Sequence, residues 1–141
     1  MFRILSSSAD THITNKIIKS TKTTASRSTN ANVGQAGSID IYKLYNETTV
    51  RSGSSGIELT RGLIKFDYTP IAELTASLVD IRSSSFKAFL SLTNSYAGDV
   101  TPSNFTLDLY PLGKAFSEGR GMDVVAYRDL DASNWFTASI S

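Results

Sequence analysis

The chain has 141 residues, with 14 Lys and Arg against 13 Asp and Glu, for a formal net charge of +1. This length is typical of one domain, so we expect residues 1–141 to form a single domain. The near-neutral charge argues against a strongly basic nucleic-acid-binding protein. The absence of cysteine excludes disulfide scaffolds, thiol nucleophiles and cysteine-based zinc sites.

The composition favours β-structure. The sequence holds 21 Ser and 15 Thr, while charged residues are only 19% and aromatic residues 10%. Strands favour Thr and aromatic residues, and turns use Ser and Gly. No apolar stretch approaches the ~20 residues that span a bilayer, so we expect no membrane partner. The start of the chain lacks the apolar core of a secretion signal, which predicts folding in the cell that makes the protein.

Period-two alternation of apolar and polar residues predicts six short strands. In chain order they cover residues 9–14, 38–45, 62–68, 86–92, 105–110 and 122–127. Residues 70–79 are expected to form one or two helical turns, with Pro70 at the first helical position. The fold class is therefore all-β, an antiparallel β-sandwich of jelly-roll-like type. Its predicted core consists of the inward positions Ile64, Phe66, Leu90, Phe105, Leu107 and Leu109.

A polar segment at residues 20–37 interrupts this pattern and offers almost nothing to bury. Residues 1–37 carry a net charge of +4, and residues 38–141 carry −3. Two interpretations stay open: a solvated loop, or an arm that lies along a partner chain. The candidate partner contacts of such an arm are Lys16, Lys19, Lys22, Arg27, Asn30 and Asn32.

The sequence carries no recognisable catalytic, metal-binding or cofactor-binding constellation. The single histidine, His12, lies in a predicted strand, where we expect a surface or edge position. Asp129 and Asp131 lack the Gly and the distal Glu of a calcium loop, so we interpret them as turn residues. Gly119 to Gly121 is too short to cradle a phosphate. We therefore expect neither an enzyme nor a bound cofactor or metal.

Aromatic residues leave a carbohydrate-binding function open. Trp135, Tyr127 and Tyr96 are candidates for a platform on which a sugar ring stacks. Such a module would serve host attachment. A polysaccharide hydrolase is a third hypothesis, but it needs two carboxylates that face each other, and nothing in the sequence selects such a pair.

Several segments resemble a family of β-sandwich modules known as DNRLRE-type. They are Ser8 to Ile13, Asn30 to Gly34, Arg61 to Asp67, Phe105 to Tyr110, Phe116 to Gly119, and Asn134 with Trp135. The amino-acid sequences of residues 13–18 and 40–45 are most similar to those of uncharacterised virion structural proteins of tailed bacteriophages. The resemblance implies a β-sandwich and a non-enzymatic structural role in capsid decoration or cement, neck, tail or baseplate.

This resemblance also implies where the protein is found and what it binds. We expect it in the virion, made in the host cytoplasm, in multiple copies on a symmetric assembly. Its expected partners are other virion proteins, with neither nucleic acid nor membrane. Modules of this kind usually continue beyond the region of Trp135, whereas this chain stops at Ser141. We therefore expect either a piece of a longer protein or an open sheet edge that recruits another strand.

Overall fold

The computed structural model describes residues 2–19, 25–45, 56–75, 78–95, 104–122 and 132–138. Its elements in chain order are β1 (Ser7–Thr14), β2 (Ile17–Lys19), β3 (Ala25–Arg27), β4 (Lys43–Tyr45), β5 (Ile57–Phe66) and α1 (Thr69–Thr75). The described part is thus mostly β, with antiparallel sheets and one short helix. This confirms the all-β class.

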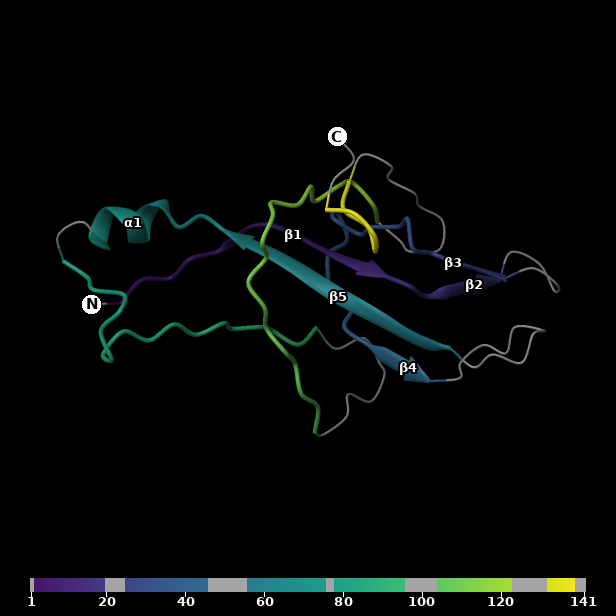
Figure 1. Ribbon diagram of the computed structural model, residues 1–141, viewed down its shortest axis with the longest axis horizontal. Helices are drawn as coiled ribbons and strands as arrows, with labels where there is room; N and C mark the ends of the chain where they lie inside the picture. The colour runs from purple at the N-terminus through teal and green to yellow at the C-terminus, as the bar shows by residue number, and fades with distance from the viewer. Residues whose placement is uncertain are drawn as a thin grey trace.

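The long antiparallel pair β1–β5 organises the molecule (Figure 1). Its register places His12 opposite Gly62 and Ile13 opposite Arg61, with an irregularity between Ser7 and Ala9. Strand β4 adds to the other edge of β5, giving the order β1-β5-β4. A second sheet contains only β2 and β3. The strands predicted at 9–14 and 62–68 are therefore confirmed as β1 and β5, although β5 begins earlier than expected and ends at Phe66. The strand predicted at 38–45 is wrong except for β4, because the Asp40 amide bonds the His12 ring and not a neighbouring strand.

The helix α1 begins directly after β5. The Asp67 carboxylate accepts hydrogen bonds from the Thr69 amide at 2.9 Å and the Thr69 hydroxyl at 2.7 Å. Asp67 therefore forms an Asx turn that starts the helix. Pro70 is the second helical residue, where its missing amide proton costs no internal hydrogen bond. The helical turns predicted at 70–79 are confirmed near Pro70, although α1 has no buried residue.

Other segments of the chain cover both faces of the β1–β5 pair. On one face, Ile39 and Ile41 lie over Gly62, and the Asp40 amide donates to His12 Nδ1 at 3.3 Å. At the β1 edge, residues 31–33 run alongside Ile13. The apolar core is small: among the described residues, the buried hydrophobic ones are Ile13, Ile17, Ala31, Val33 and Ala132.

The strands predicted at 86–92 and 105–110 are not strands in this structure. A strand exists only when its backbone pairs with another strand, and within the described residues neither segment has such a partner. In Figure 1, the green segment that begins at residue 104 crosses the direction of β5 and does not run beside it as a paired strand. The strand predicted at 122–127 lies outside the described residues beyond Met122.

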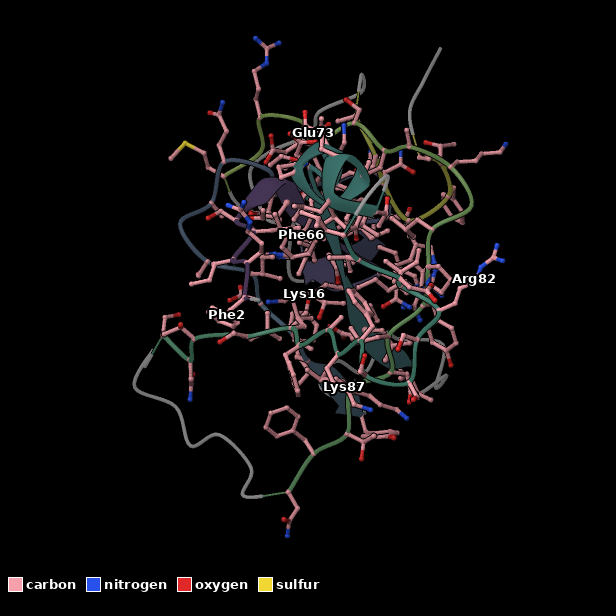
Figure 2. The ribbon with its side chains drawn as sticks, turned by 90° about the vertical axis from the view of Figure 1, so that its left-hand side faces the viewer. Phe2, Lys16, Phe66, Glu73, Arg82 and Lys87 are labelled. Carbon is pink, nitrogen blue, oxygen red and sulfur yellow. The ribbon has the colours of Figure 1, made fainter. Side chains whose placement is uncertain are left out.

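The predicted core is correspondingly wrong for four of its six residues. Leu90, Phe105, Leu107 and Leu109 are exposed, because their segments do not pack on the sheet. Ile64 and Phe66 are half-buried on β5. Figure 2 shows Phe66 near the middle of the molecule, and Phe2 and Lys87 toward its periphery.

Candidate functional site

Asn32 lies where two distant parts of the chain approach each other closely. Its backbone bridges to Ile13 of β1, and its side chain is fully buried. The Asn32 Oδ1 atom accepts a hydrogen bond from the Gly121 amide at 3.2 Å, and the Gln35 amide donates to the Gly121 carbonyl at 2.8 Å. Residues 31–35 and 118–121 are therefore locked together across 89 positions of sequence.

Glycines make this close approach possible. A Cβ atom on Gly119 would overlap the Asn32 amide, and one on Gly121 would overlap the Asn32 backbone carbonyl. Gly119 also adopts a φ of 79°, in the left-handed region that favours glycine. A Cβ on Gly34 would overlap the Glu118 carbonyl. These positions require glycine because two backbones meet there.

Trp135 attaches the C-terminal segment to the same region. Its amide donates to the Thr29 carbonyl at 3.0 Å. The Arg61 guanidinium of β5 lies 4.0 Å from the centroid of the Trp135 ring, a cation–π contact. Asn134 Oδ1 accepts from the amides of Phe136 and Thr137, which holds the turn that presents the indole.

The opposite face of β1 carries a buried polar cluster: His12, Thr14, Tyr42 and Glu58. The Thr14 hydroxyl lies 2.8 Å from the Tyr42 hydroxyl and donates to the Leu59 carbonyl at 2.8 Å. It also accepts from the Lys16 amide at 3.0 Å. Glu58 is only 2% exposed, and its Oε1 atom has no hydrogen-bond partner among the described residues. The Lys16 Nζ atom lies 5.9 Å from the Tyr42 ring centroid.

Burial controls the protonation of two members of this cluster. Desolvation lowers the pKa of His12 below 6.5, and the charge of Asp40 opposes this only in part. Desolvation raises the pKa of Tyr42 above 10.0; the hydrogen bond with Thr14 opposes this rise, and the charges of Glu58 and Asp40 add to it. His12 is 2% exposed, so the expectation of a surface position is wrong: residues 39–41 cover it. Its strand β1 does lie at an edge of the sheet, as the alternative expectation had it. A neutral, covered imidazole is suited to packing and does not reach a surface-bound substrate.

The residues proposed as a partner-contact arm divide into four groups. Asn32 is buried in its own chain, so its assignment to an exposed arm is wrong. Residues 25–27 pair with β2, and exposed Arg27 donates to the Asn15 carbonyl at 2.9 Å. Lys16 and Asn30 are half-buried. Lys22 and the Lys19 side chain lie outside the described residues. The part of the arm that the structure describes therefore packs against its own chain.

The proposed sugar platform has only one member within the described residues. Tyr96 and Tyr127 lie outside them. Trp135 is half-buried, and Arg61 occupies one face of its ring. A sugar that stacks on an aromatic ring needs an open face. The Arg61 contact therefore counts against Trp135 as the centre of a platform.

Exposed apolar side chains define the larger candidate surface. Among the described residues, eighteen large hydrophobic side chains are exposed, against five buried hydrophobic residues. Most monomeric proteins expose such residues singly, and continuous stretches mark interaction sites. The longest stretch here is 104–112, which we call the apolar segment; it contains Phe105, Leu107, Leu109, Tyr110 and Leu112.

The described residues contain neither a cluster of potential metal ligands nor a membrane-spanning helix. No group of three or more His, Cys, Asp or Glu there is placed to hold a metal ion. Within the same residues, no helix has both the length and the apolar character to cross a membrane.

Comparison with known proteins gave no relative: no family model, curated protein or solved structure matches the chain. The structure itself brings together several motifs from distant parts of the sequence. Asn30 to Gly34, Phe116 to Gly119 and Asn134 with Trp135 all meet at Asn32 and at the face of β5 that carries Arg61.

Sequence analysis did not identify the contact between Asn32 and its glycines. The available signal was the pair Gly119 and Gly121 around a single arginine, since glycines at this spacing also occur where two backbones approach closely. The polar cluster around Glu58 left no signal, because isolated Thr, Tyr and Glu residues on strands are usually solvent-facing.

Proposed function

We propose that the chain is a non-enzymatic structural protein of a tailed-bacteriophage virion, which binds other virion proteins. The observation that carries the structural role is the apolar segment, which is extended and exposed along residues 104–112. Apolar surface of this extent costs free energy in water and is normally covered by another protein. Membership of a virion rests on the resemblance of residues 13–18 and 40–45 to uncharacterised virion structural proteins of tailed bacteriophages.

The exposed apolar segment also bears on how the β-fold is completed. Strand β5 has one face toward Trp135 and the other toward Ile39 and Ile41, so loops rather than a second sheet cover this layer. We propose that assembly completes a jelly-roll-like sandwich, with exposed extended segments such as 104–112 becoming strands. Capsid decoration or cement, neck, tail and baseplate remain the candidate locations.

Density-gradient sedimentation tests this function. The purified chain is mixed with particles of the phage that encodes it, or with isolated capsids and tails. Co-sedimentation at a fixed ratio supports a virion component, and the particle part that it follows gives the location. A chain that stays at the top of the gradient in every mixture contradicts the proposal. A chain that stays at the top but binds a glycan array favours a carbohydrate-binding module.

A further inference from the structure

The apolar segment has the residue pattern of a β-strand, but it pairs with no strand among the described residues. Phe105, Leu107 and Leu109 alternate with Thr106 and Asp108, and the three apolar side chains are 64%, 42% and 72% exposed. Its backbone is extended but belongs to no sheet of the described chain. Figure 1 shows this green segment crossing the direction of β5 rather than running beside it. An extended backbone with one apolar side is suited to adding to an open sheet edge.

The same chain offers such an edge at β4. This strand is the last in the order β1-β5-β4, and within the described residues nothing pairs with its outer side. Tyr45 and Ile57 lie opposite each other in the register, which places them on one face, and both are exposed. A strand added to β4 would satisfy the edge and bring apolar side chains next to Tyr45.

One chain carries both an exposed strand-like segment and an open sheet edge. This indicates that a second copy of the chain supplies the strand that pairs with the β4 edge. The net charge of +1 gives little repulsion between copies. Lys43 of β4 and Asp108 of the apolar segment carry opposite charges, which favours contact between these two parts of two copies. We propose that the apolar segment of one copy adds as a strand to the open β4 edge of a second copy. Each copy donates one strand and accepts one, which builds a reciprocal dimer or a closed ring.

This inference deepens the proposed structural role by naming a partner, and it is tested on the purified chain without virus particles. Sedimentation velocity of the wild-type chain at micromolar concentration is expected to show an oligomer. The double variant Leu107→Glu/Leu109→Glu places two charges in the proposed interface and should weaken association at least about tenfold. Both residues are exposed in the single chain, so circular dichroism should show the fold unchanged.

The matched control is Leu78→Glu/Ile81→Glu. It makes the same change in charge and hydrophobicity at two exposed residues outside the apolar segment, and association should stay as in the wild type. A wild-type chain that remains monomeric overturns the proposal. An oligomer that persists in the Leu107→Glu/Leu109→Glu variant overturns it as well.

Cross-linking tests the β4 edge. The chain has no cysteine, so introduced cysteines report only the designed pair. Leu109→Cys in one preparation is mixed with Lys43→Cys, or with Tyr45→Cys, in another preparation of different mass. A mixed disulfide in either mixture supports the proposal. An oligomer that yields no mixed disulfide in both mixtures overturns β4 as the acceptor. If the chain is monomeric alone but co-sediments with particles, the proposed function is supported and the proposal of a second copy as partner is overturned.

Discussion

The Arg61 guanidinium lies 4.0 Å from the centroid of the Trp135 ring, which joins the middle of β5 to the C-terminal segment. Arg61 is exposed and Trp135 half-buried, so the contact is at the surface. Cation–π pairs at such sites contribute about 0.5–1 kcal/mol. A double-mutant cycle with Arg61→Ala and Trp135→Ala should therefore give a coupling free energy of about 0.5–1 kcal/mol in urea denaturation.

The control for this cycle replaces Arg61→Ala with Arg82→Ala. Arg82 is an exposed arginine of the segment after α1, so its coupling with Trp135 should be near zero. Equal coupling for both arginines would mean that the effect is general charge and not the stacked geometry.

Gly119→Ala tests the contact between residues 31–35 and 118–121. The left-handed backbone at φ 79° costs an alanine about 1–2 kcal/mol, and its Cβ would also overlap the Asn32 amide. The free energy of unfolding should thus fall by at least about 1 kcal/mol. Gly113→Ala is the matched control, since a Cβ there meets nothing within 4 Å, and its stability should stay the same or rise slightly. Equal effects at both positions would contradict the account of Asn32.

Thr14→Val tests the buried polar cluster. The substitution keeps the shape of the side chain but removes the hydroxyl that bonds Tyr42, the Leu59 carbonyl and the Lys16 amide. Leaving buried polar groups unpaired costs about 1–3 kcal/mol, so chemical denaturation should show a loss of this size. Thr75→Val removes one exposed hydroxyl bond to Ala72 and should cost less than about 0.5 kcal/mol. A loss at Thr14 as small as at Thr75 would show that the cluster does not stabilise the fold.

His12 makes stability depend on pH in the mildly acidic range. Its pKa in the folded chain is lowered from the ordinary 6.5, so the unfolded chain binds the proton first as the pH falls. The free energy of unfolding should therefore decrease on acidification from about pH 7 to about pH 5, because the proton stabilises the unfolded state. His12→Asn keeps an acceptor for the Asp40 amide and should flatten this dependence.

The Asp67 carboxylate affects the free energy of unfolding in a different pH range. Its two hydrogen bonds from Thr69 lower its pKa below 3.8, so its contribution is lost only as the pH falls through strongly acid values. Urea titrations of the wild type and His12→Asn at several pH values separate the two groups. Identical slopes between about pH 5 and pH 7 would contradict the assignment to His12.

The sequence was sufficient to predict the elements whose signals are local. Alternation at Ile64 and Phe66 predicted β5, and Pro70 predicted the start of the helical turns at α1. The all-β class followed from composition. These features depend on neighbouring residues only, which is why no long-range information was needed.

The candidate site depends on long-range contacts and was predicted poorly. Asn32 looked like an exposed arm residue because most of the segment 20–37 is polar, and its burial comes from Gly119 and Gly121, almost ninety positions later. Leu107 and Leu109 show the reverse case. Their alternation is a strand signal, but a pattern does not say which chain supplies the partner strand.

Amide hydrogen exchange across residues 104–112 tests most directly whether this segment is covered by protein in its working state. The measurement compares the chain in dilute solution with the same chain in an assembled oligomer or bound to a particle. The account predicts fast exchange in the dilute chain and strong protection of alternate amides after assembly, because a paired strand hydrogen-bonds its backbone. Exchange in the assembled state as fast as in the dilute chain would contradict the claim that the apolar segment becomes an interface strand.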